Sequence, residues 1–109
     1  MRKSRIITSR KMIMFKPPHP GEIINEDYLV PLGMSVNRLA KGLGIGATRL
    51  NEIVRGKRSI TADTALRLAR YFGTSPEFWL NLQSLYDLRM AERKARTRIE
   101  REVTPLKVA

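Results

Sequence analysis

The sequence predicts an all-α fold of five helices, and three observations support it. Apolar residues recur at intervals of three and four, and no stretch alternates in the manner of a strand. Cap residues, glycines and prolines mark successive helix ends. Within residues 35–56, two short amphipathic segments flank a glycine-rich turn, which is the pattern of a helix-turn-helix. The 109 residues fit one small domain, whose modest core favours a second subunit that buries further surface.

The helix-turn-helix pattern depends on one cap, one glycine and two apolar sides. Ser35 is a good N-cap, and Gly44 suits the left-handed residue that ends a helix. Ala40 is small enough to let the second helix approach the first. The inward-facing residues are Val36, Leu39, Ala40 and Leu43 on the first helix, and Leu50, Ile53 and Val54 on the second.

The opposite side of the second helix predicts DNA binding. A period of 3.6 residues turns Thr48, Glu52 and Arg55 away from the apolar side, with Arg49 and Asn51 on the flanks. These side chains can bond base edges and phosphates in a major groove. The alternative is an ordinary helical hairpin with a solvated polar face.

A basic turn follows this helix directly. Arg55, Lys57 and Arg58 surround Gly56, and such a cluster beside a groove-reading helix is suited to a phosphate strand. We expect Arg49 and Asn51 to read bases and Arg58 to hold the backbone of the duplex. The alternative is a solvated loop.

The charge and composition of the chain narrow its function further. There are 21 Lys and Arg against 10 Asp and Glu, a formal net charge of +11, which favours nucleic acid as partner and an anionic membrane surface second. No apolar run is long enough to span a bilayer, so we expect a protein of the cytoplasm. Cysteine is absent, and the single His19, expected to be solvated, cannot build a His-rich metal site. We therefore expect that this protein is not an enzyme and that it binds no cofactor and no metal.

The segments before the helix-turn-helix are an extension and a first helix. Residues 1–16 are basic and free of acids, and they suit either a flexible arm on phosphates or, slightly favoured, an extension without a role. Pro20 begins the first helix, whose apolar side includes Ile24 and Tyr28. We expect this helix to stop near Leu29, because the residue before Pro31 avoids helical geometry.

A fourth helix follows the basic turn. Thr61 caps it, Asp63 lies in its first turn, and Gly73 ends it. Its expected apolar side consists of Ala62, Ala65, Leu66, Ala69 and Phe72.

The fifth helix begins at Ser75-Pro76-Glu77 and has two apolar stripes. One consists of Phe78, Leu82 and Leu85, and the other of Trp79, Tyr86 and Met90. We expect one stripe to close the core and the second, assigned to Trp79, Tyr86 and Met90, to form a homodimer interface. The alternative is that both stripes lie in the core.

Residues 89–109 form a charged extension of this helix and a tail. Glu92 with Arg96, and Arg98 with Glu102, are spaced to support a helix through opposite charges. The chain is thus divided into an extension over 1–16, a helix-turn-helix domain over 17–88, and a charged extension over 89–109.

These residues carry a family resemblance. Residues 35–56 look like the Cro/cI-like (XRE) helix-turn-helix, and about residues 17–92 closely resemble the HigA-type antitoxins, also called virulence-associated protein I-like proteins. The resemblance lies in HPGEII, LAKGLG and LNEIVRGKRSITADTALRLARYFGTSPEFWLNLQ.

This resemblance implies a five-helix, lambda repressor-like DNA-binding domain with an extended C-terminal helix. It implies a homodimer that represses its own operon at a palindromic, double-stranded operator. It also implies neutralisation of a HigB-type ribonuclease toxin in a type II toxin–antitoxin system. The alternative is a helix-turn-helix transcriptional regulator with no toxin partner. The DNA-facing positions carried over are Thr48, Arg49, Asn51, Arg55, Lys57 and Arg58.

Overall fold

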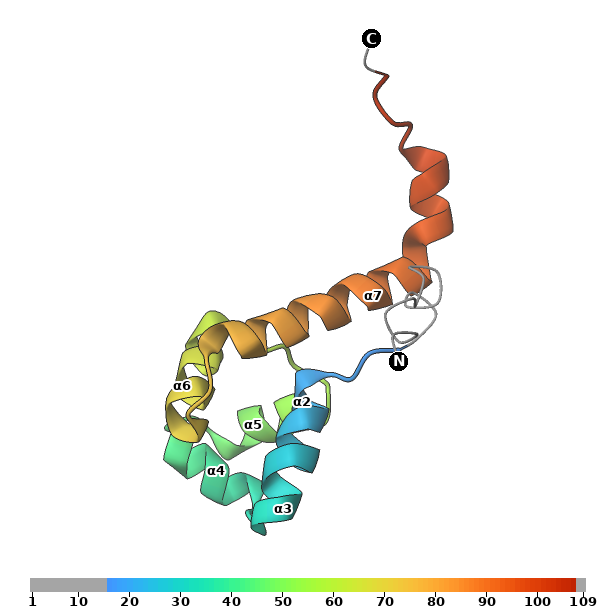
Figure 1. The fold of residues 1–109 in the computed structure, drawn as a ribbon. Coiled ribbons are helices and arrows are strands. Elements are labelled where there is room, and N and C mark those ends of the chain that lie inside the picture. Colours follow the sequence, from blue (N-terminus) through green and yellow to red (C-terminus); the bar gives the residue numbers. More distant parts are fainter. Residues whose placement is uncertain (1–15, 108–109) are drawn as a thin grey trace, which may run out of the picture.

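The computed structural model describes residues 16–107, and every regular element among them is helical (Figure 1). The first three elements, α2, η2 and α3, follow one another without a break and form one helix. With the remaining elements they make five helices in the described residues, so the predicted fold class is confirmed. The bounds are α2 Pro20–Ile23, η2 Ile24–Leu29, α3 Val30–Leu32, α4 Val36–Leu43, α5 Ala47–Val54, α6 Ala62–Phe72 and α7 Pro76–Glu102. The basic segment expected over residues 1–16 falls almost wholly outside the described residues.

Three helix starts and two helix ends fall where the cap residues and glycines predict them. The hydroxyls of Ser35, Thr61 and Ser75 each accept a hydrogen bond from the backbone N–H three residues on, at 3.0 to 3.3 Å. These bonds satisfy a backbone donor that has no partner inside the helix. Gly44 and Gly73 are left-handed, with φ of 74° each, and end α4 and α6.

The first helix is longer than its sequence predicts. The expectation that it stops near Leu29 is wrong, because helical geometry continues to Leu32 and ends at the left-handed Gly33. Residues Ile24–Leu29 form a π-helix, a wider turn than the α-helix. The π-helix ends two residues before Pro31, whose ring would otherwise meet a carbonyl one turn back.

His19 caps this helix and is buried. Its Nδ1 accepts from the Gly21 N–H at 2.9 Å, and its ring packs edge-on against Tyr86 of α7, with centroids 4.9 Å apart. The residue is 4% exposed, so the expectation of a solvated histidine is wrong. Burial lowers the pKa of His19, although the nearby charges of Asp87 and Glu22 oppose this shift.

The core lies where all five helices meet. Trp79 of α7 is its largest fully buried side chain. The first helix and α5 approach so closely that a Cβ on Gly21 would overlap the Ile53 carbonyl. The buried cluster consists of Ile24, Leu29, Leu39, Ala40, Leu43, Leu50, Ile53, Ile60, Ala65, Leu68 and Trp79.

The inward side of α6 is rotated from the expected one. Ala65, Leu68 and Ala69 are buried, whereas Leu66 is 59% exposed and Ala62 is exposed. Leu68 lies three positions after Ala65 and Ala69 lies four positions after it, so all three residues share one side of the helix. Leu66 lies about 100° from Ala65 around the helix, so its inward assignment is wrong.

The two stripes of α7 do not separate into one core stripe and one interface stripe. Leu82, from the first stripe, is half-buried and packs against the core. Trp79 is wholly buried, and its Nε1–H donates to Thr74 Oγ1 at 2.8 Å, so its assignment to a dimer interface is wrong. Tyr86 and Met90 are half-buried on the same side. Phe78 and Leu85, expected to compete for the core, are 41% and 40% exposed.

The charged segment continues α7 as expected. Figure 1 shows the second half of this helix bending and projecting away from the bundle. Arg98 lies 3.4 Å from Glu102, as predicted. Glu92 instead pairs with Arg89, at 3.0 Å, and not with Arg96. Arg89 and Glu92 are mostly shielded from water, which strengthens their attraction.

Residues 16–107 lack two features, a membrane-spanning helix and a cluster of metal ligands. No helix in this range combines the length and apolar character needed to cross a membrane. The range also contains no group of three acidic or histidine side chains arranged to hold a metal ion.

Candidate nucleic-acid interface

The turn between α4 and α5 presents the outer side of α5 to solvent. Ile45 N–H donates to the Ala40 carbonyl at 3.1 Å, which closes the end of α4 after the left-handed Gly44. Leu50 and Ile53 are buried, so α5 is held by its apolar side. Its polar side therefore faces outward over the full length of the helix.

The outward surface contains most of the predicted DNA-facing residues. Thr48, Asn51 and Arg55 are exposed along α5, and Lys57 and Arg58 are exposed in the turn that follows. The side chains offer a hydroxyl, an amide and cations, which are the donors that base edges and phosphates accept from. The structure brings these five residues onto one continuous segment.

Arg49 has a different environment from the other predicted residues. It is half-buried, and its Nη2 donates to Thr64 Oγ1 of α6 at 3.0 Å. Thr64 is fully buried, and its hydroxyl lies 3.2 Å from that of the cap residue Thr61. Arg49 therefore links α5 to the beginning of α6, a contact between distant segments that helical spacing alone does not indicate.

Glu52 is half-buried on α5 and pairs with the basic turn. Its Oε1 accepts from Arg58 Nε at 2.8 Å and lies 2.7 Å from Arg58 Nη2. Arg58 thus lies back over α5 and partly neutralises the acid.

The basic turn is fixed at both ends. Gly56 is left-handed, with φ of 76°, and Lys57 N–H donates to the Glu52 carbonyl at 2.8 Å. Beyond the turn, Ile60 N–H donates to Gln83 Oε1 of α7 at 2.8 Å. Gln83 is 5% exposed. Sequence reasoning missed it, although a polar residue four positions after Trp79, on the inward side, was the available signal.

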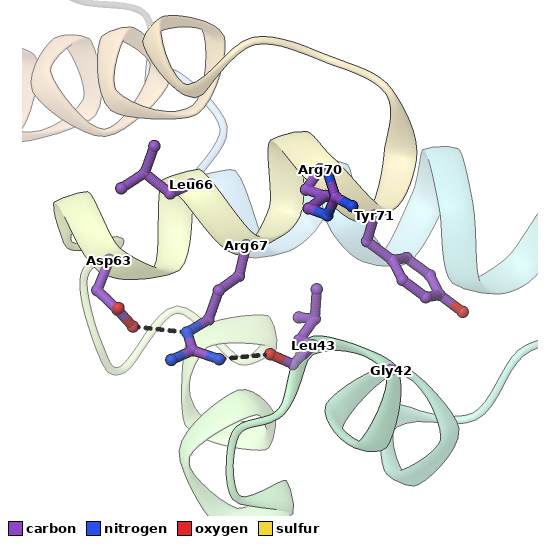
Figure 2. Close-up of a pocket in the computed structure, with 7 residues that line it drawn as sticks. All are labelled: Gly42, Leu43, Asp63, Leu66, Arg67, Arg70 and Tyr71. Atoms are coloured by element: carbon purple, nitrogen blue, oxygen red, sulfur yellow. Dashed lines mark hydrogen bonds and ion pairs between the residues drawn. The ribbon is translucent and has the colours of Figure 1, made fainter.

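The α4–α5 turn is also supported from α6 (Figure 2). Arg67 Nη1 donates to the Leu43 carbonyl at 2.9 Å, and its Nε donates to Asp63 Oδ2 at 2.8 Å. The guanidinium therefore satisfies a carbonyl at the end of α4, where positive charge is favourable. The Tyr71 ring lies so close to Gly42 that a Cβ there would be 2.6 Å from the ring. Side chains from α6 hold the α4–α5 unit, beside an open groove of about 590 Å³.

Comparison with known proteins matches this geometry to one family. Residues 26–79 match the family model described as Helix-turn-helix. Virulence-associated protein I of Dichelobacter nodosus is 61% identical over 74 residues, which are 68% of this chain and 68% of that protein.

Two solved structures extend the match over more of the chain. One is an addiction module antidote protein of a HigA family from Coxiella burnetii, at 56% identity and a TM-score of 0.80; the match covers 84% of this chain and all of that one. The other is Pseudomonas aeruginosa antitoxin HigA with the higBA promoter, at 46% identity and a TM-score of 0.80, covering 84% of this chain and 99% of that one. This chain therefore belongs to the HigA-type family of helix-turn-helix antitoxins.

Proposed function

We propose that this protein binds operator DNA in the cytoplasm through the outward side of α5 and the basic turn, and so represses its own operon. The observation that carries the proposal is the exposed series Thr48, Asn51, Arg55 and Lys57, presented by α5, whose other side is buried, and by the turn that follows it. The HigA relative from Pseudomonas aeruginosa, which was solved with its promoter, supports the same use of the fold.

The proposal assigns different roles to two of these side chains. Asn51 lies on α5, where an amide can pair with adenine N6 and N7 in the major groove. Lys57 lies past the end of the helix, in the turn, where contact with a phosphate is favoured. Only the first role depends on the DNA sequence.

Fluorescence anisotropy with two duplexes tests this assignment. One duplex comes from the DNA directly upstream of the gene, and the other has the same bases in scrambled order. Asn51→Ala should cost about 1–3 kcal/mol on the upstream duplex and lower the ratio of specific to non-specific affinity. Lys57→Ala should weaken both duplexes by similar factors and reduce the salt slope by about one. A wild-type affinity that does not change with salt concentration would contradict the proposal.

We further propose that the protein neutralises a partner toxin of the ribonuclease type. The relative from Coxiella burnetii, described as an addiction module antidote protein, supports this part. Co-expression with the product of the neighbouring open reading frame is the test. A stable complex that suppresses messenger-RNA cleavage is the expected result. Absence of any complex would leave a regulator without a toxin.

A further inference from the structure

The proposed DNA surface contains a single carboxylate. Between residues 35 and 60 the sequence has six Lys or Arg side chains and one acid, Glu52. A carboxylate on this surface repels phosphates, so it opposes the part of DNA binding that does not depend on sequence. Its position therefore needs a reason other than general affinity.

Glu52 restrains a cation that the surface would otherwise offer to phosphates. Its Oε1 lies 2.8 Å from Arg58 Nε and 2.7 Å from Arg58 Nη2, so one oxygen holds two nitrogens of the guanidinium. The backbone supports this arrangement, because the Glu52 carbonyl also accepts from Lys57 N–H at 2.8 Å. Glu52 thus fixes the turn with its main chain and Arg58 with its side chain.

The pair is suited to open when a better partner is present. The two side chains remain 51% and 41% exposed, for Arg58 and Glu52 respectively. Exposed ion pairs contribute little to folding stability, so opening this one leaves the fold intact. The released groups could then bind a phosphate and a base-edge donor.

We propose that Glu52 is a specificity-determining residue, which holds Arg58 back from the phosphates of DNA that lacks a donor for the carboxylate. The N4 amino group of cytosine is the major-groove donor that a glutamate accepts from. On DNA with that donor in reach, Glu52 bonds the base and Arg58 binds a phosphate. On other DNA the pair stays closed and one phosphate contact is lost. The inference rests on the proposed function, because it requires α5 to lie against the duplex.

Glu52→Gln tests the inference, and Glu100→Gln is its matched control. Glu100 accepts from Arg96 at 3.0 Å, and the pair is 64% and 50% exposed on the projecting half of α7. Both variants change the net charge equally and break one exposed pair. On the scrambled duplex, Glu52→Gln should bind about three- to tenfold more tightly, with a salt slope steeper by about 0.9. Glu100→Gln should leave that slope unchanged. The affinity of Glu52→Gln for the upstream duplex should rise by a smaller factor or fall, so that the ratio of upstream to scrambled affinity decreases.

Repeating the comparison in Arg58→Ala separates restraint of Arg58 from simple repulsion. In that background, Glu52→Gln should no longer steepen the salt slope. The inference would be overturned if Glu52→Gln raised the affinity for the scrambled duplex equally with and without Arg58. It would also be overturned if Glu52→Gln and Glu100→Gln raised that affinity equally. Thermal melts of each variant establish that the fold is retained. If the wild-type protein discriminates between the two duplexes and Glu52→Gln binds both with wild-type affinity, only this inference is overturned. A wild-type protein that binds neither duplex would overturn the proposed function with it.

Discussion

His19 shows how one side chain connects three parts of the molecule. It caps the first helix through the Gly21 N–H, packs against Tyr86 of α7, and lies beside Gly56 of the basic turn. The capping bond uses the lone pair of Nδ1, which exists only while that nitrogen is unprotonated. Protonation would therefore remove the cap and place a charge in a buried site.

This predicts a loss of stability in mild acid. Burial lowers the pKa of His19 in the folded state below the ordinary value of 6.5, so the unfolded chain binds more protons at pH values between the two. The stabilising contribution is complete above about pH 6.5 and decreases as the pH falls toward the folded pKa. Melting temperatures at pH 7.5 and 5.5 measure it. In His19→Asn, which can still cap the helix, the difference between the two temperatures should shrink. Equal differences in the two proteins would contradict this account.

Arg49 and Asn51 differ in their predicted effect on folding. Arg49 bonds the buried Thr64, whereas Asn51 is exposed. Arg49→Ala should lower the free energy of unfolding by about 1 kcal/mol, because it leaves a buried hydroxyl with fewer partners. Asn51→Ala should change it by less than about 0.5 kcal/mol. Urea denaturation of both variants makes the comparison, and equal stabilities would refute a linking role for Arg49.

At the scale of the element, the first helix and α5 depend on one close approach. Gly21 has no side chain where the Ile53 backbone passes, and this contact brings the N-terminus of the first helix against α5. Backbone atoms cannot move aside as the end of a flexible side chain can. The position of the DNA-facing helix therefore depends on a residue that never faces DNA.

Gly21→Ala should cost about 3 kcal/mol or more of stability, because a methyl group would overlap the Ile53 carbonyl. Gly46→Ala is the control, since no atom lies within 4 Å of its built Cβ, and it should cost less than about 1 kcal/mol. Chemical denaturation provides both values. A Gly21→Ala protein as stable as the Gly46→Ala protein would show that the two helices can separate without penalty.

Local chemistry explains why some elements were predictable. Ser35, Thr61 and Ser75 begin helices because each hydroxyl satisfies a nearby backbone donor, and this needs no distant partner. Gly44 and Gly73 end helices because the left-handed conformation suits glycine. The helix-turn-helix and the five-helix fold follow from such signals together with apolar spacing.

The errors lie where tertiary contacts decide. The π-helical turn carries the first helix past Pro31, and His19 is buried by Tyr86, which lies 67 residues later. The Arg49–Thr64 bond and the Gln83–Ile60 bond likewise join segments far apart in sequence. Spacing within one helix indicates which residues share a side but not which side meets a neighbour. For this reason the spacing predicts an interface role for Trp79, whereas the residue lies in the core.

At the scale of the whole molecule, α7 leaves two large apolar side chains of one stripe exposed, Phe78 and Leu85. Phe78 and Leu85 remain 41% and 40% exposed, although Phe78 contacts the buried Trp79 ring edge-on and Leu82, from the same stripe, packs against the core. Two-fold dimers of helix-turn-helix proteins present their recognition helices to half-sites about 34 Å apart, which matches a palindromic operator. We propose that two copies of this chain pack through Phe78 and Leu85, whereas Trp79 stays in the core of each copy.

Leu85→Glu should therefore produce a monomer that still folds, because a charge in an apolar interface is costly while the same side chain in water is not. Ser84→Glu, one position earlier on the exposed surface, is the control and should remain a dimer. Light scattering gives the mass of each protein, and thermal melts verify the fold. Trp79→Ala should instead lose about 3–5 kcal/mol of stability, since it empties the centre of the core. A wild-type monomer at high concentration, or a Leu85→Glu dimer, would exclude this stripe as the interface. A Trp79→Ala protein that stays fully stable but becomes monomeric would restore the interface first expected.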